Sequence, residues 1–166
     1  MPSSLVVLTA VALAADPPLA VVPDLDLTRL AGEWYEIAAI PTFFTRGCTA
    51  GVSRYTMVEP DRFEVVTTCR KGSPTGEEVV SDGTLRVADR GVPAKLEINY
   101  VPFIWGAYWV IEKADDYGYL VVGHPSRGYL WVYAREPAMD PDLYRGVMSR
   151  LEAVGYELDT IVRTER

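Results

Sequence analysis

The sequence is poor in the residues that most enzyme and metal sites need. Its 166 residues include one histidine and two cysteines, without a Cys-x-x-Cys pair or a glycine-rich loop of the kind that cradles phosphate. Nucleophilic catalysis needs a nucleophile beside a base, and acid–base catalysis needs paired groups in a cleft. Because neither arrangement is assembled in the sequence, we expect no catalytic residue, no metal site and no cofactor.

Positive charge is also scarce. Sixteen Lys and Arg residues against 23 Asp and Glu residues leave a formal net charge of −7. Phosphate backbones are held by clustered cations, so nucleic acid is not an expected partner. The hydrophobic share of 49% and the charged share of 23% are ordinary for a globular protein and exclude a disordered chain. The length suits a single domain.

Only one apolar run is long enough to suggest a targeting segment. Leu5–Ala15 is too short to cross a bilayer as a helix, has the length of a signal-peptide core, and includes the small-x-small pattern Ala12-Leu13-Ala14. We therefore expect a signal peptide at 1–14, a flexible Pro-rich segment at 15–23 and one domain at 24–166, an uncleaved tail being the alternative. Since no cysteine adjoins the cleavage pattern, we expect no lipid anchor. The expected product is periplasmic or secreted, associated with an outer membrane at most peripherally.

The two cysteines, Cys48 and Cys69, each lie in a strand-like run. Antiparallel pairing of the two runs could bring them together, and in an exported chain this predicts a disulfide. The alternative is a nucleophilic or redox thiol, which would need an adjacent base. The only histidine, His124, lies in a turn sequence.

From Pro23 almost to the end, the pattern alternates or is briefly apolar, and turn residues interrupt it about every ten positions. Asp115-Asp116-Tyr117-Gly118, for example, predicts a tight reversal in which Gly118 can take a positive φ. We expect an all-β fold, an antiparallel up-and-down meander of eight strands, at 33–40, 48–58, 62–70, 77–88, 94–101, 107–113, 118–122 and 128–135.

One helix is expected, over about 141–154. Asp140 is a typical N-cap residue, Pro141 fits the first helical position and Gly155 follows the end. An apolar stripe formed by Leu143, Val147, Leu151 and Val154 predicts that this helix packs outside the sheet. The run 160–163 could add a ninth strand at an edge.

Four features in order carry a resemblance. They are Gly32-Glu33-Trp34-Tyr35 in the first strand, Asp115-Asp116-Tyr117 at the sixth reversal, the strand Tyr129–Arg135, and the helix after it. Together they resemble the lipocalins, and in detail the bacterial lipocalin (Blc) group that includes apolipoprotein-D-like proteins. The resemblance covers roughly 24–163. One departure is Ala114, where the family usually has Thr.

The resemblance implies a calyx closed at one end, in which Gly32, Trp34, Asp115, Tyr117 and Arg135 are structural. The Trp34 indole would lie at the closed base with the Arg135 guanidinium across it, a cation–π contact. The resemblance also places Cys48 and Cys69 where paired second and third strands would be bridged.

An eight-stranded barrel can hold one small ligand if its side chains leave room. Face assignment from one sequence is uncertain by one register step, and ordinary core packing is an equal alternative at each position. The residues expected to line the cavity are Tyr55, Met57, Leu85, Leu96, Ile98, Tyr100, Trp109, Tyr129 and Trp131. Arg46, Arg54 and Arg70 could serve a ligand head group, although solvated strand-end charges explain them better.

Two connections are unusually apolar: Pro41-Thr42-Phe43-Phe44, the family's lid region, and Val101-Pro102-Phe103-Ile104-Trp105-Gly106. They could form the rim of the cavity, a homodimer contact, or loops packed on the barrel. The expected function is binding, storage or transport of small hydrophobic ligands, with fatty acids or lysophospholipids implied by the family, in the cell envelope. The alternatives are a lipid-modifying enzyme with a cavity thiol and a partner-binding barrel with a filled interior.

Overall fold

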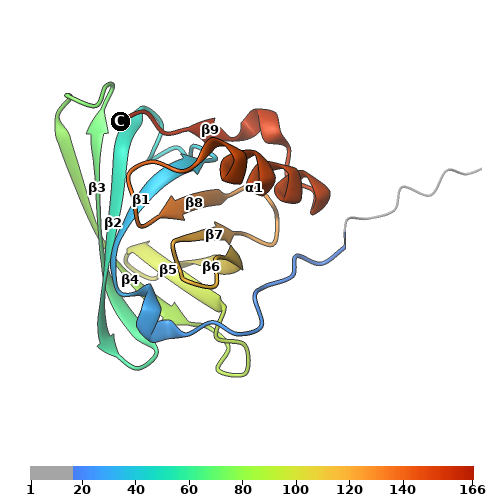
Figure 1. The fold of residues 1–166 in the computed structure, drawn as a ribbon. Coiled ribbons are helices and arrows are strands. Elements are labelled where there is room, and N and C mark those ends of the chain that lie inside the picture. Colours follow the sequence, from blue (N-terminus) through green and yellow to red (C-terminus); the bar gives the residue numbers. More distant parts are fainter. Residues whose placement is uncertain (1–16) are drawn as a thin grey trace, which may run out of the picture.

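The computed structural model describes residues 17–166, so the predicted signal peptide at 1–14 lies outside the described residues. Over 17–166, nine strands form one antiparallel sheet (Figure 1). The strands that build the barrel wall are β1 (Gly32–Ala39), β2 (Cys48–Glu59), β3 (Arg62–Lys71), β4 (Glu78–Val87), β5 (Lys95–Val101), β6 (Ile104–Lys113), β7 (Tyr119–Gly123) and β8 (Leu130–Ala134).

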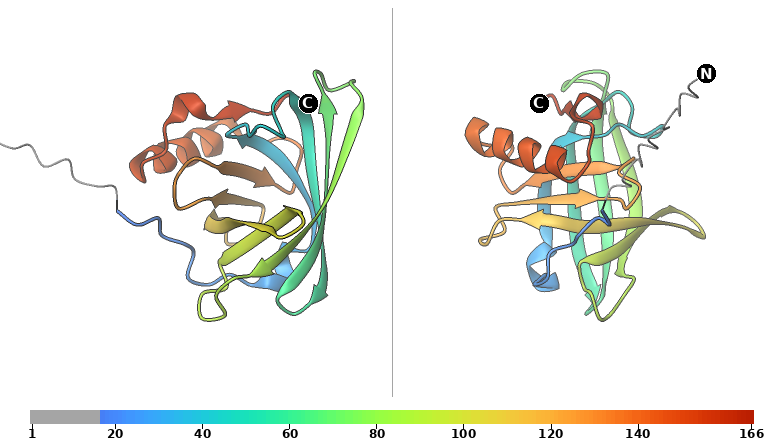
Figure 2. Two further views of the ribbon diagram at one scale, coloured as in Figure 1. Left: turned by 180° about the vertical axis from the view of Figure 1, so that it is seen from behind. Right: turned by 90° about the vertical axis from the view of Figure 1, so that its right-hand side faces the viewer.

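The sheet closes on itself. Each strand from β2 to β8 pairs with the next along the chain, and β1 pairs with both β8 and β2. The strands β2 to β4 cross β6 to β8 at a steep angle (Figure 2). The predicted eight-stranded up-and-down barrel is confirmed.

One end of the barrel is covered by a short 3-10 helix, η1 (Leu27–Leu30), in which Leu30 is buried. The predicted flexible segment at 15–23 precedes this helix, and its described part contacts the barrel at two points. Leu19 is buried against the outer core, and the Val22 N–H donates to the Val110 carbonyl at 3.0 Å. Apolar contact and main-chain bonding thus hold residues 17–23 on the barrel.

The outer layer is the predicted helix, α1 (Pro141–Ala153). The Asp140 carboxylate caps it by accepting from the N–H groups of Asp142 and Leu143 at 2.9 and 3.0 Å. Val147 and Leu151 are buried against the barrel, whereas Leu143 and Val154, at the two ends of the predicted stripe, are exposed. None of the helices formed by residues 17–166 has the length and apolarity needed to span a membrane.

The segment after α1 passes through η2 (Leu158–Thr160) and ends in β9 (Val162–Arg163), the ninth strand. β1 pairs with β2 only from Gly32 to Tyr35. Where the two strands separate, β9 pairs with Ala38 and Ala39 of β1, and Glu165 accepts from the Ala50 N–H of β2 at 2.7 Å. Residues 162–166 therefore fill the gap between β1 and β2, and we call them the seam segment.

Cys48 and Cys69 form a disulfide with a Cα–Cα distance of 5.5 Å. The bridge joins the start of β2 to the end of β3, as predicted. Since the sequence has no other cysteine, the bridge leaves no thiol for the nucleophile of the enzyme alternative.

Candidate functional site

Strand register determines which side chains point into the barrel, because directly opposed residues share a face. Leu85 pairs with Phe63 and with Ile98, and Leu96 pairs with Tyr108. The inner core built from this face also includes Trp34, Tyr55, Val110, Leu120 and Tyr133. A second core, on the outer face, joins the barrel to α1.

The closed end is plugged by Trp34 and Arg135. Trp34 is fully buried, and its indole N–H donates to the Leu30 carbonyl at 2.8 Å. The Arg135 guanidinium lies 3.6 Å from the Trp34 ring centroid and donates to main-chain carbonyls of Arg29, Ala31 and Glu33. These contacts tie η1 to β1 and β8, so the two residues hold the barrel end shut.

Gly32 is required beside this plug. Its φ of +103° favours glycine, and a Cβ at this position would lie 3.1 Å from Arg135 Nη1. A side chain here would therefore strain the backbone and crowd the guanidinium that covers the indole.

The reversal at Asp115–Gly118 also serves the closed end. The buried Tyr117 hydroxyl accepts from the Asp26 N–H at 2.7 Å, and the Arg29 guanidinium lies 4.2 Å from the Tyr117 ring centroid. The main-chain carbonyls of Asp115 and Asp116 accept from Arg29. The residue with positive φ is Tyr117, at +59°, rather than Gly118 as expected.

Three buried tyrosines form a floor across the barrel, which we call the tyrosine floor: Tyr55, Tyr108 and Tyr133. The Tyr55 and Tyr108 hydroxyl oxygens lie 2.6 Å apart, and Tyr108 donates to Tyr133 at 3.2 Å. Burial raises the pKa of all three hydroxyls. The three groups therefore stay neutral and satisfy one another's polar atoms inside an apolar core.

Inner-face side chains near the open end remain partly accessible to solvent. This wall, which we call the cup, consists of Glu36, Ile98, Tyr100, Gly106 and Trp131. At Gly106 there is free space: of residues 17–166, apart from its chain neighbours, only the Ile98 carbonyl oxygen would lie within 4 Å of an added Cβ, at 4.0 Å. The inner face therefore has open space beside β6 at this position.

A row of hydroxyls runs along one side of the cup. Tyr100 Oη lies 2.9 Å from Thr67 Oγ1, which lies 3.0 Å from Ser53 Oγ. The Tyr100 ring reaches across β4 because Gly83 has no side chain, and a Cβ there would lie 2.8 Å from the ring. Tyr100 is 43% exposed, yet burial by the surrounding wall raises its pKa, as expected for a group inside a concave surface.

The structure places most of the predicted lining residues on the inner face. Tyr55, Leu85 and Leu96 are buried in the inner core, and Met57, Ile98 and Trp131 pack against it. Tyr55 belongs to the tyrosine floor, while Leu85 and Leu96 are fully enclosed. Of the predicted set, Ile98, Tyr100 and Trp131 therefore form part of the cup.

Trp109 does not line the cavity, so its predicted placement is wrong. It pairs with Lys95 and Gly123 on the outer face and packs against the core beneath α1. Lys95 Nζ lies 5.0 Å from its ring centroid. The inner residue is its neighbour Tyr108, as the one-residue register alternative allowed.

An aromatic row leads from the tyrosine floor toward the mouth. The ring centroids of Tyr108 and Trp131 lie 5.4 Å apart, those of Trp131 and Tyr129 lie 6.4 Å apart, and those of Tyr129 and His124 lie 5.3 Å apart. Tyr129 is 44% exposed and belongs to the rim. The row provides a continuous apolar path along β8.

The two apolar connections both lie at the open end, and they are not packed onto the barrel. Phe43 and Phe44 are 85% and 82% exposed, and Phe103 is 98% exposed. Ile104 to Gly106 belong to β6 rather than to a loop, which reduces the second connection to a turn at Pro102 and Phe103. The exposure of Phe43, Phe44 and Phe103 argues against packing of these rings onto the barrel and leaves the rim of the cavity and a homodimer contact as the alternatives.

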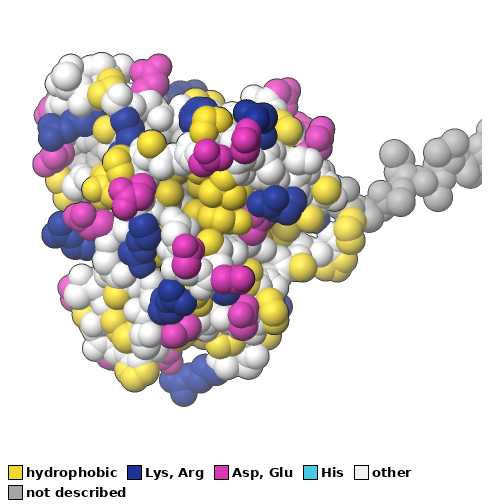
Figure 3. All heavy atoms as spheres, in the orientation of Figure 1, with side chains coloured by type: hydrophobic (Ala, Val, Ile, Leu, Met, Phe, Trp, Pro, Cys, Tyr) yellow, Lys and Arg dark blue, Asp and Glu magenta, His cyan; other side chains and the backbone are white. Residues whose placement is uncertain are grey.

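Charges at the strand ends are mostly paired. Arg54 pairs with Glu33, and Arg70 pairs with Glu78 at 2.9 Å, so two of the three arginines considered for a head group already have carboxylate partners. On the face shown in Figure 3, basic and acidic side chains are interspersed rather than gathered by sign.

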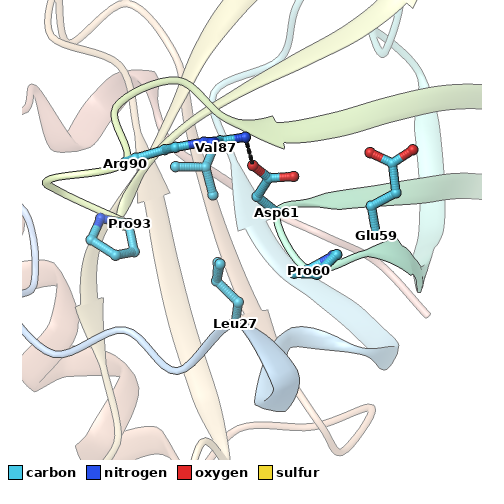
Figure 4. A pocket seen from close by; sticks show the side chains of 7 residues that line it. All are labelled: Leu27, Glu59, Pro60, Asp61, Val87, Arg90 and Pro93. Carbon is cyan, nitrogen blue, oxygen red and sulfur yellow. Dashed lines mark hydrogen bonds and ion pairs between the residues drawn. The ribbon is translucent and has the colours of Figure 1, made fainter.

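A separate hollow of about 590 Å³ lies at the closed end, outside the barrel. Figure 4 shows Leu27 and Val87 facing it, beside the ion pair that Arg90 forms with Asp61 at 2.9 Å. Sequence reasoning did not identify this hollow, because it is formed by three loops that are distant in the chain.

A family model described as a lipocalin-like domain matches residues 25–166. The chain belongs to the lipocalin family. Temperature-induced lipocalin-1 of Arabidopsis thaliana is 28% identical over 152 residues, covering 87% of this chain and 81% of the relative. Outer membrane lipoprotein Blc of Escherichia coli (strain K12) is 26% identical over 150 residues, covering 88% and 83%.

Solved structures agree on the fold. Insecticyanin from the tobacco hornworm Manduca sexta superposes on this lipocalin with a TM-score of 0.72 at 17% identity, covering 92% of this chain and 86% of the other. At that identity the likeness concerns the fold alone. The cup of this lipocalin accordingly occupies the open end of a barrel shared with distant proteins.

Proposed function

We propose that this lipocalin binds, stores or transports one small hydrophobic ligand in its cup, and that the ligand belongs to the fatty-acyl lipids, as fatty acid or lysophospholipid. The observation that carries the proposal is the free space on the inner face at Gly106, beside Ile98. Burial of an alkyl chain there would contribute about 0.8 kcal/mol per methylene without a charged anchor.

The bridge and the relatives support the proposed compartment. A disulfide persists in an oxidising environment, which supports an exported, periplasmic or secreted protein. The name outer membrane lipoprotein, carried by the Escherichia coli relative, supports a role in the cell envelope. The partner-binding alternative requires a filled interior, and the space at Gly106 argues against it.

The test is a ligand titration with matched variants. A fluorescent fatty acid should bind the wild type, and Gly106→Leu, which fills the cup, should weaken binding at least about tenfold, or about 1.4 kcal/mol. Trp109→Phe, on the outer face, should leave the affinity unchanged. Equal affinities in all three proteins would exclude the cup as the site.

Native mass spectrometry of the protein purified from its host complements the titration. A co-purified acyl lipid would support the lipid class, whereas a repeatedly ligand-free protein that binds no acyl probe would contradict the proposal. The homodimer through the exposed rim remains a prediction, and sedimentation equilibrium of the wild type decides it.

A further inference from the structure

One carboxyl group lies inside the cup, and the sequence analysis did not identify it. Glu36 pairs with Tyr133 across β1 and β8, and so shares the inner face with the tyrosine floor. Its side chain lies against Gly51 of β2, where an added Cβ would be 3.2 Å from Glu36 Cβ. β1 thus directs this acid into the barrel, two residues after Trp34.

Few polar contacts offset the burial of the Glu36 carboxyl group. Thr164 of the seam segment donates to Oε1 at 2.7 Å. The Arg166 guanidinium donates instead to the main-chain carbonyls of Glu36 and Gly51, and it lies over the Tyr35 ring on the outer face. None of the ion pairs formed among residues 17–166 includes Glu36.

A partly buried carboxylate without an ion partner is costly, and proteins usually pair such a group or keep it neutral. Burial raises the pKa of Glu36, against the opposing effects of the Thr164 hydrogen bond and the Arg166 charge. A cation bound in the cup would stabilise the ionised form.

The remaining polar groups of the cup do not offset a negative ligand. The row formed by Ser53, Thr67 and Tyr100 contributes hydroxyls, which can both donate and accept. Of the three arginines considered for a head group, Arg54 and Arg70 are paired with carboxylates, and Arg46 is exposed in the loop before β2. A carboxylate head group inside the cup would therefore be repelled by the Glu36 carboxylate, and neither Arg54 nor Arg70 is free to offset that repulsion.

We propose that Glu36 determines ligand specificity, by selecting amphiphiles whose head group is an ammonium over those whose head group is a carboxylate. This inference rests on the proposed function and narrows it: among the acyl lipids proposed for the cup, those with an ammonium in the head group bind more tightly than fatty acids, which still bind through the alkyl chain. Ile98, Gly106 and Trp131 hold the apolar part, while Glu36 and the hydroxyl row face the head.

The experiment uses three ligands with the same alkyl chain. Dodecylamine, dodecanol and dodecanoate displace the neutral probe N-phenyl-1-naphthylamine from the full chain at pH 7.5, below their micelle concentrations. We expect the wild type to bind dodecylamine at least about tenfold more tightly than dodecanoate, or about 1.4 kcal/mol. In Glu36→Gln this ratio should fall to near one, with dodecanol unchanged.

The matched control is Glu33→Gln. Glu33 is also on β1, but it is paired with Arg54 at the surface, and its removal should leave the amine-to-carboxylate ratio at the wild-type value. A second variant, Thr164→Val, retains the carboxyl group and should retain the preference for the amine.

The outcomes separate the inference from the proposed function. If dodecanoate binds the wild type as well as dodecylamine does, or if Glu36→Gln keeps the wild-type ratio, Glu36 is not the determinant, although the cup still binds lipid. If neither the probe nor dodecanol binds, both proposals are overturned. The wild-type ratio alone decides the first point even if a variant fails to fold.

Discussion

The Arg135 guanidinium lies 3.6 Å from the Trp34 ring centroid, and its N–H groups donate to three main-chain carbonyls from η1 to β1. The same type of contact occurs on the outer face, where the Arg86 guanidinium lies 3.7 Å from the Trp105 ring centroid. The two pairs share this stacking geometry but differ in burial and in the number of carbonyls that the arginine binds. Comparing the stability lost on truncating each arginine therefore shows what burial and the carbonyl bonds add.

Truncation of the inner pair should strongly reduce stability. We expect Trp34→Ala to lower the free energy of unfolding by about 3–5 kcal/mol, and Arg135→Ala by about 2–3 kcal/mol, because several charge-assisted hydrogen bonds are lost. Arg86→Ala, which removes a surface stack and a surface ion pair with Glu97, should cost at most about 1 kcal/mol. Urea denaturation measures all three, and similar losses for Arg135 and Arg86 would contradict the plug.

The disulfide between Cys48 and Cys69 should contribute about 3 kcal/mol through the 21-residue loop that it closes. The double variant Cys48→Ser/Cys69→Ser should therefore unfold at a lower denaturant concentration than the oxidised wild type. The reduced wild type serves as the control and should match the double variant. If oxidised and reduced proteins have the same midpoint, the bridge adds no stability.

The tyrosine floor should make the protein sensitive to alkali. Burial raises the pKa of Tyr55, Tyr108 and Tyr133, whereas unfolded tyrosine ionises near its ordinary pKa of about 10. The folded state then binds more protons than the unfolded state above that pH, so this contribution to stability is complete below pH 10 and decreases as the pH rises further. Absorbance at 295 nm should show these three groups ionising only on unfolding.

Substitutions at Tyr108 and Trp109 test the contribution of the tyrosine floor to stability. Tyr108→Phe removes the hydroxyl between the other two and should cost about 1–2 kcal/mol, because it leaves buried polar atoms without a partner. Trp109→Phe changes the adjacent residue on the outer face and should lower the free energy of unfolding by less than Tyr108→Ala does. The reverse order would indicate that Trp109, not Tyr108, supports the core.

The helix cap offers a local prediction. Asp140→Ala removes the acceptor of the Asp142 and Leu143 N–H groups and should lower stability by about 1 kcal/mol. Asp140→Asn, which can still accept these bonds, should stay within a few tenths of the wild type. Thermal melting followed by circular dichroism distinguishes the two, and a loss of equal size in Asp140→Asn would point to charge rather than capping.

The barrel, the helix and the bridge were predictable from the sequence. Turn residues separate the strands clearly, and polar and apolar residues alternate along several of them. In β5, the polar residues Lys95, Glu97 and Asn99 alternate with apolar ones, so the inner face was assigned correctly. In β6, both faces are apolar, since α1 and the segment around Leu19 cover the outside. Alternation alone could not separate Tyr108 from Trp109.

Glu36 was missed for the opposite reason. A charged residue in a strand is ordinarily interpreted as facing solvent, and only its pairing with Tyr133 shows that it faces inward. β1 also shifts register between Glu36 and Ala38, which no pattern in the sequence indicated. The preceding Trp34, known to point inward from the resemblance, is the signal that could have identified it by counting two residues.

The seam segment also has a consequence for how the nascent chain folds. Thr164 reaches Glu36 across 128 positions, so β1 cannot acquire that neighbour until nearly all of the chain described here has been translated. At a synthesis rate of about 5–20 residues per second, the delay is roughly 6–25 s. Throughout that interval the end of β1 at Ala38 and Ala39, which pairs with β9 in the complete barrel, keeps an unpaired edge open to wrong partners, and factors that shield emerging chains would protect this edge.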